Sequence, residues 1–103
     1  MEITYTCRGL IGDKECSWPG TMRFISLTLP YEAVLTVNGS AFHLIVGAYA
    51  QGHYLCIPNW SIGIELASLS DHFWNQEQLC RVGLSDVDVY SISAAIAEME
   101  KYA

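Results

Sequence analysis

The sequence predicts an α+β fold, in which an antiparallel β-meander of about five strands is followed by two or three C-terminal helices packed on one face of the sheet. Two observations support this fold class. The segment 40–60, SAFHLIVGAYAQGHYLCIPNW, is the most apolar part of the chain and has the pattern of two strands joined by a tight Gln51-Gly52 turn. After it, in residues 61–102, the apolar residues change from a strand period to a helix period.

The length of the chain predicts one domain. A chain of 103 residues can bury one core but not two, so we expect residues 1–103 to form a single domain, mostly β in 1–58 and mostly α in 61–102. Apolar residues make up 51% of the chain and charged residues 16%, as in globular proteins. The chain has no apolar run long enough to span a membrane and no pattern of a signal peptide, so we expect a cytoplasmic protein.

The N-terminal part of the chain predicts two strands. Residues 2–8 alternate between apolar and polar side chains, which is typical of a strand with one wet face. Gly12-Asp13 predicts a hairpin turn, and the next strand is expected to begin near Cys16. Pro19-Gly20 predicts a bulge or an edge position, because proline has no N–H to donate to a neighbouring strand. The alternation resumes in residues 21–29.

Two tight turns organise the central strands. Asn38-Gly39 predicts a type I′ turn, because both of its central residues need positive φ. The Gln51-Gly52 turn is expected to pair Ala50 with His53. These registers predict an apolar face formed by Leu35, Phe42, Leu44, Val46, Ala48, Leu55 and Ile57. The opposite, mixed face is formed by Thr36, His43, Ile45, Gly47, Tyr49, Tyr54 and Cys56. A slip of one residue would exchange the two faces.

Three helical segments are expected in the last third of the chain. Residues 61–70 place Ile62, Leu66 and Leu69 at helical spacing and predict a short helix. Asp71 is the expected N-cap of a second helix, which ends at Gly83. Ser85 is expected to cap the longest helix, 86–102. Its apolar stripe is predicted to be Val89, Ile92, Ile96 and Met99, opposite Asp88, Ser91, Glu98 and Lys101.

Cysteine and histidine supply the ligand types of a zinc site. One hypothesis is a zinc ion held by Cys7, Cys16, Cys56 and His43. The sequence contains no close C-x-x-C pair, so the preferred interpretation is that the cysteines are small buried apolar residues and that the protein has no cofactor. Cys56 with His43 or His53 would also suit nucleophilic catalysis, but no oxyanion-hole motif accompanies the pair, so we do not expect an enzyme.

The charge and the aromatic residues favour a protein partner. Eleven acidic residues against five basic ones give a net charge of −6, which disfavours direct nucleic-acid binding and suits either solubility or a basic partner. Tyrosine and tryptophan are frequent interface anchors. Among the aromatic residues, Phe73 is expected in the core, and Tyr49 and Tyr54 on the mixed face. The candidate partner-binding residues are Asp13, Glu15, Glu32, Tyr49, Tyr54, Asp86, Asp88, Glu98 and Glu100.

The segment HLIVGAYAQGHYLCIPNWSIGIELASLSDHFWNQEQL resembles a small uncharacterised family from Firmicutes and their phages and mobile elements. In that family a strand ending in LCIPNW precedes ELASLSD. The family's size, acidity and mobile-element association are similar to those of anti-CRISPR proteins, which implies an inhibitor of a Cas9-type nuclease. No functional residue can be carried over.

Two alternatives to the inhibitor stay open. One is an accessory protein-interaction domain, with or without a stabilising zinc ion, and the other is a small Cys/His enzyme. Both a monomer and a homodimer fit the sequence.

Overall fold

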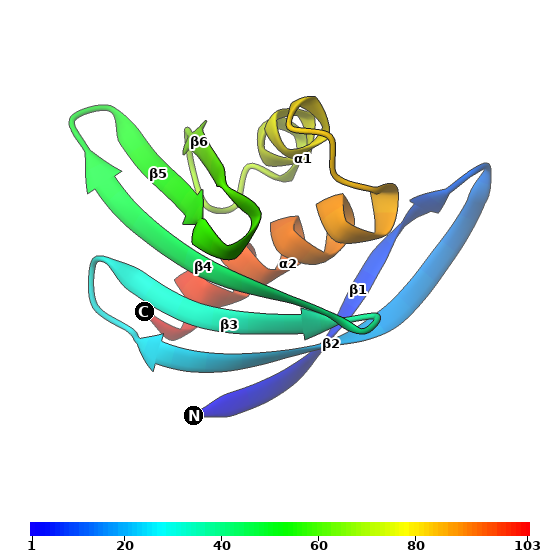
Figure 1. Ribbon diagram of the computed structural model, residues 1–103, viewed down its shortest axis with the longest axis horizontal. Coiled ribbons are helices and arrows are strands. Elements are labelled where there is room, and N and C mark those ends of the chain that lie inside the picture. The colour runs from blue at the N-terminus through cyan, green and yellow to red at the C-terminus, as the bar shows by residue number, and fades with distance from the viewer.

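The computed structural model describes all 103 residues and confirms the α+β class, with one strand more than expected. A single antiparallel sheet has its strands in sequence order, so that each strand lies beside the strands that precede and follow it, and two helices cover one face (Figure 1). The strands are β1 (Glu2–Ile11), β2 (Lys14–Ser26), β3 (Tyr31–Val37), β4 (Ser40–Tyr49), β5 (Gly52–Ile57) and β6 (Ile62–Leu66). A 3₁₀ turn, η1 (Pro58–Trp60), precedes β6, and the helices are α1 (His72–Arg81) and α2 (Asp86–Tyr102). Neither helix is both long and apolar enough to cross a membrane.

The turn between β3 and β4 is the one that the sequence predicts. Asn38 and Gly39 have φ values of 48° and 80°, as a type I′ turn requires. The turn pairs Val37 with Ser40, and the resulting register buries Leu35, Phe42, Leu44 and Val46 of the predicted apolar face, whereas Ala48, near the end of β4, is exposed.

The turn between β4 and β5 lies one residue earlier than predicted. Tyr49 pairs with Gly52, so the turn residues are Ala50 and Gln51, and the register differs by two residues from the expected one. Gly52 is needed for a different reason: a Cβ atom there would lie 2.6 Å from the backbone oxygen of Leu66. Because side chains alternate with a period of two, the shift leaves the assignment of faces unchanged.

The helix predicted for residues 61–70 is wrong, because residues 62–66 form β6. Ile64 and Leu66 are buried and alternate with Gly63 and Glu65 along the strand. In so short a segment the apolar residues fit both a strand period and a helix period. The segment forms a strand because its backbone pairs with the edge of β5. This strand accounts for the sixth member of the sheet.

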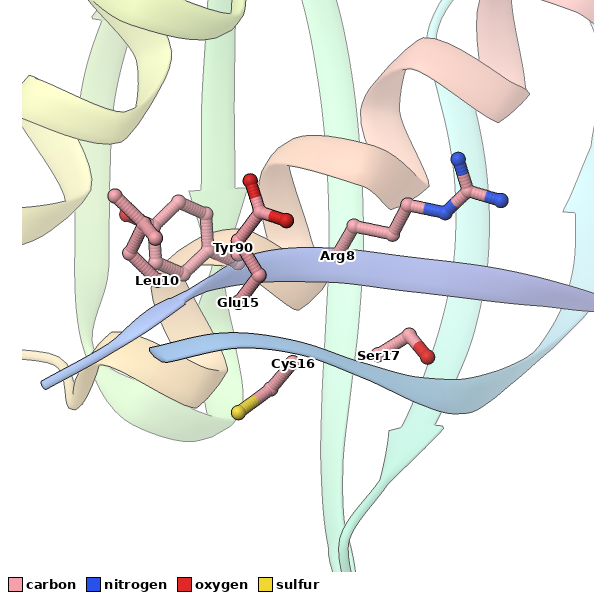
Figure 2. Close-up of a pocket in the computed structure, with 7 residues that line it drawn as sticks. Arg8, Leu10, Glu15, Cys16, Ser17 and Tyr90 are labelled. Carbon is pink, nitrogen blue, oxygen red and sulfur yellow. The ribbon is translucent and has the colours of Figure 1, made fainter. Parts of the chain in front are cut away.

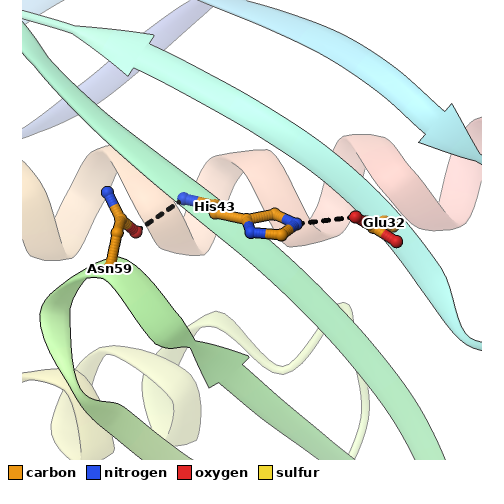
Figure 3. A network of polar contacts seen from close by, with 3 residues as sticks. All are labelled: Glu32, His43 and Asn59. Carbon is orange, nitrogen blue, oxygen red and sulfur yellow. Dashed lines mark hydrogen bonds and ion pairs between the residues drawn. The ribbon is translucent and has the colours of Figure 1, made fainter.

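The LCIPNW segment closes the end of β4 with side chains. β5 pairs with β4 only as far as Ile45. Beyond that point, the Asn59 amide oxygen accepts a hydrogen bond from the backbone N–H of His43 at 3.0 Å (Figure 3). The Asn59 amide nitrogen donates to the carbonyl of Ala41 at 2.8 Å. Trp60 donates to the same carbonyl at 3.0 Å and stacks on Phe42 with ring centroids 4.8 Å apart. The Asn59 amide therefore continues the hydrogen-bond ladder in place of a strand.

Pro19 occupies an edge position, as predicted. β2 pairs with β3 only from Thr21 onward, so Pro19 lies where β2 has β1 as its single neighbour. The bulge of β2 lies elsewhere, between Phe24 and Ser26.

Helix α2 covers β1, β2 and β3, and α1 packs against α2 and β6. The predicted stripe of α2 is buried, but Ser91, predicted on the exposed side, is buried as well. Its hydroxyl accepts a hydrogen bond from the indole of Trp18 at 2.7 Å and donates to the carbonyl of Val87 at 2.6 Å. Its carbonyl accepts from the hydroxyl of Tyr5 at 3.0 Å. These partners fix α2 onto the first hairpin.

Candidate functional site

Phe73 is the most exposed large apolar side chain of the protein, with 81% of its surface accessible. The carboxylate of Asp71 caps α1 by accepting from the backbone N–H of Trp74 at 3.1 Å, which fixes where the helix begins. With that start, Asn75 and Leu79 are the residues that α1 buries. The expectation that Phe73 lies in the core is therefore wrong, because α1 turns its first-turn ring away from its buried side.

An open depression of about 350 Å³ lies beside Phe73, between α1 and α2. We call it the α1–α2 depression; its lining consists of Phe73, Gln76, Glu77, Cys80, Asp86, Val89 and Tyr90. Glu77 forms an ion pair with Arg81 at 2.9 Å one turn along the helix. The hollow thus combines an apolar floor with two carboxylates.

A second depression of about 630 Å³ lies across Tyr90, over the first hairpin. Figure 2 shows its lining, in which Leu10 and Glu15 are drawn beside the ring of Tyr90, and Cys16 lies farther away on β2 with its side chain directed away from the ring. Gly9 allows this arrangement, because a Cβ atom at that position would lie 2.3 Å from the Tyr90 ring. Tyr90 lines both depressions, so they lie next to each other on either side of its ring.

The structure divides the predicted acidic contact residues into groups. Glu15 and Asp86 line the two depressions on either side of Tyr90. Asp13 lies in the β1–β2 turn, one residue before β2, and Asp88 lies in the first turn of α2. Glu98 and Glu100 lie in the last turns of α2, where Glu98 pairs with Lys101 at 3.1 Å.

The remaining predicted contact residues lie away from the helices. Glu32 bonds His43 at 2.7 Å on the uncovered face of the sheet (Figure 3). The ring of Tyr54 lies over Gly63, because its hydroxyl would be 2.6 Å from a Cβ atom there. Tyr49 is exposed at the end of β4. The nine residues therefore do not form one patch.

The four candidate zinc ligands are not brought together. Cys7 is buried under α2, whereas His43 and Cys56 lie on the opposite face of the sheet, and Cys16 is exposed at the end of the first hairpin. No three histidine, cysteine or acidic side chains gather as a metal-binding group. Residues on two faces of one sheet cannot share an ion, so the predicted ligand set is not a site in this structure.

Cys56 forms no hydrogen bond with either candidate histidine: His43 contacts Glu32, and the buried Nδ1 of His53 has no hydrogen-bond partner. His72 instead contacts Ser93, with its Nδ1 3.2 Å from the hydroxyl, and Ser93 is fully buried. No pattern in the sequence indicates this contact, which joins the two helices.

Cys7 lies in a buried polar cluster with Tyr5 and Ser91. Burial raises the pKa of the Cys7 thiol, and hydrogen bonds to Ser91 and Tyr5 offset part of that rise. Burial, followed by the neighbouring Cys7, raises the pKa of the Tyr5 hydroxyl far above its usual range. Both groups are therefore held in their neutral forms, which suits packing rather than attack on a substrate.

Comparison with known proteins places the chain in one family. Residues 3–103 match the model of a family described as "Family of unknown function (DUF6618)", so the chain belongs to that family. No curated protein and no solved structure matches it.

Proposed function

We propose that this member of the DUF6618 family is a protein-binding domain, and that its partner sits over the α1–α2 depression. The observation that carries the proposal is Phe73, an aromatic ring that stands almost free in water beside a hollow. Aromatic side chains contribute a large share of binding energy when they become buried at the centre of an interface. Exposed apolar surface of this kind, next to polar groups, is typical of interaction sites.

The charge around the hollow favours a basic partner. Glu77, which pairs with Arg81, and Asp86 line the α1–α2 depression, and Glu15 lines the adjoining one together with the basic Arg8. The whole chain carries a net charge of −6. Such a field attracts a surface rich in lysine and arginine and speeds its association.

The partner that we propose is a Cas9-type nuclease. The resemblance to a mobile-element family and the analogy with anti-CRISPR proteins support this choice. Cas9-type nucleases hold their guide–target duplex in a positively charged channel. The acidic rim around Phe73 would occupy such a surface in place of nucleic acid, and inhibition would then follow from occupancy alone.

Two matched variants test the surface. Phe73→Ala is expected to weaken binding to the nuclease by about tenfold or more, because it removes the anchor. Tyr49→Ala is the control, because it removes another exposed aromatic side chain, at the end of β4. We expect the affinity of this variant for the nuclease to stay within about twofold of wild type. Biolayer interferometry gives the affinities, and circular dichroism checks that both variants fold.

A double variant that replaces two carboxylates with neutral amides tests the electrostatic contribution to binding. Glu15→Gln with Asp86→Asn is expected to slow association and to flatten its dependence on salt, with little change in dissociation. A cleavage assay tests the proposed target. If an excess of wild-type protein leaves DNA cleavage by every Cas9-type nuclease unchanged, that target is rejected. Equal binding by Phe73→Ala and wild type would reject the proposed surface, and loss of binding in Tyr49→Ala alone would move the interface to the uncovered side of the sheet.

A further inference from the structure

Strand β1 leaves one whole side of its backbone without a partner. It lies at the edge of the sheet, with β2 as its single neighbour (Figure 1). Its ten residues pair with β2 in one unbroken register and include no proline. Long, regular edge strands are templates for pairing with another chain, and natural proteins usually blunt them.

The opposite edge of the sheet is protected. β6 has five residues, and α1 lies against it. The indole of Trp74 donates a hydrogen bond to the carbonyl of Glu65 at 3.3 Å, on the side of β6 that faces away from β5. The fold thus covers one edge and leaves the other open.

The hydrogen-bond pattern identifies the free groups of β1. The backbone N–H of Phe24 donates to the carbonyl of Met1 at 2.9 Å, so the odd-numbered residues of β1 bond to β2. The even-numbered residues turn their N–H and C=O groups outward; these residues are Glu2, Thr4, Thr6, Arg8 and Leu10. All five are exposed.

We propose that a second copy of this chain pairs antiparallel along this edge, so that Glu2 of each copy lies opposite Arg8 of the other. The same register places Thr4 opposite Thr6, and the two-fold axis passes between the two Tyr5 residues. Only pairings between even-numbered residues use the free backbone groups. A shift of two residues would place Glu2 opposite Thr6 or Leu10, so this register alone pairs opposite charges at both ends.

Charge complementarity supports a second copy as the occupant. Neither Glu2 nor Arg8 forms an ion pair within its own chain. Opposite charges and threonine pairs directly across two strands are favourable cross-strand neighbours. The net charge of −6 opposes association of two copies, but this repulsion is screened beyond about 8 Å at physiological salt. The edge itself carries one acidic and one basic residue, so its local charge is balanced.

Charge swapping tests the register. Sedimentation equilibrium of the full chain, after removal of any tag, is expected to show a monomer–dimer equilibrium. Glu2→Arg or Arg8→Glu alone should raise the dissociation constant about tenfold, because like charges then face each other twice. The double variant Glu2→Arg/Arg8→Glu should return it to within about threefold of wild type.

A backbone variant tests the edge independently. Thr6 lies opposite Pro19, where its N–H points away from β2, so Thr6→Pro removes an outward donor and no bond to β2. It should abolish dimerisation, whereas Thr6→Ala should not. A wild-type protein that stays monomeric at several hundred micromolar would overturn the proposal. Equal dimer dissociation constants in the single and double charge variants would also overturn it. So would a protein that stays monomeric, binds an extended foreign peptide and no longer binds that peptide as the Thr6→Pro variant. Phe73→Ala is expected to dimerise normally, because no residue of β1 lines the α1–α2 depression, although Arg8 also lines the depression over the first hairpin.

Discussion

Gly52 is required by close packing of two strands, although its neighbours in the sequence suggest that it is a turn residue. Next to Gln51 it resembles a turn glycine, but the residues with positive φ in tight turns are others, such as Gly12 and Gly39. Gly52 instead lies where the backbone of Leu66 passes within 2.6 Å of the position of a Cβ atom. The glycine therefore allows β6 to approach β5, which only the folded structure reveals.

Gly52→Ala is expected to lower the free energy of unfolding by about 1–3 kcal/mol, because a backbone oxygen cannot rotate away from the added methyl group. Gly47→Ala is the matched control: it lies in the neighbouring strand, its φ is not positive, and nothing lies within 4 Å of the added atom. We expect that control to be neutral or to stabilise the protein by up to about 1 kcal/mol. Urea denaturation measures both, and equal stabilities would contradict the assigned role.

Phe73 and Ser91 show the limit of assigning helix faces from single residues. Phe73 is apolar but lies on the exposed side of α1, and Ser91 is polar but lies on the buried side of α2, so hydrophobicity alone misplaces both. Ser91 is buried because its hydroxyl and carbonyl meet Trp18, Tyr5 and Val87, which are polar partners that no apolar pattern can reveal. The most exposed residue of the candidate site was therefore the one that the sequence predicted to be buried.

Among the elements, those with a local signal were predictable. The Asn38-Gly39 turn fixes β3 and β4, and the caps Asp71 and Ser85 fix the starts of α1 and α2. β6 has no such signal, because its five residues fit two periods and its stability comes from pairing with β5. An element that depends on a distant edge cannot be identified from its own residues.

Asn59 extends the ladder of β4 in place of a strand, so its side chain should contribute measurably to stability. Asn59→Ala is expected to cost about 1–3 kcal/mol, since it leaves the N–H of His43 without its acceptor and removes a donor to Ala41. Asn59→Asp should also destabilise the protein, because it keeps the acceptor for His43 but places a carboxylate oxygen against the carbonyl of Ala41 in place of the donor. Thermal denaturation gives the order of stability.

Trp60→Phe is the control for this element. It keeps an aromatic ring to stack on Phe42 but loses the second donor to Ala41, so we expect a loss of about 1 kcal/mol. If Asn59→Ala were as stable as wild type, the Asn59 side chain would not act as a substitute strand.

At the scale of the whole molecule, the sequence could not predict which charges come together. Glu15 and Asp86 are far apart in the chain, and they border one surface because α2 begins over the end of the first hairpin. Asp86 and Glu98 lie on one helix but at different ends of it. The direction of α2 across the sheet therefore decides the layout of the candidate surface, and that direction follows from packing rather than from local pattern.

The two helices differ in how extensively they pack against the rest of the molecule. α2 lies against three strands, whereas α1 lies against α2 and the short edge strand β6. Asn75, on the buried side of α1, donates to the carbonyl of Ser68 at 3.1 Å, but its own oxygen has no partner. An unsatisfied buried acceptor costs about 1–3 kcal/mol. These features predict that β6 and α1 open more easily than the rest of the fold.

Hydrogen exchange followed by mass spectrometry tests this difference. Amides of residues 62–81 should exchange faster than those of β2 to β4 and α2, because their local opening needs less free energy than global unfolding. Asp71→Ala removes the cap of α1 and should destabilise that helix by about 1 kcal/mol. If β6 and α1 open as a separate unit, this variant will speed exchange there and leave α2 unchanged. Acceleration by the same factor throughout the chain would show instead that the molecule opens as one cooperative unit.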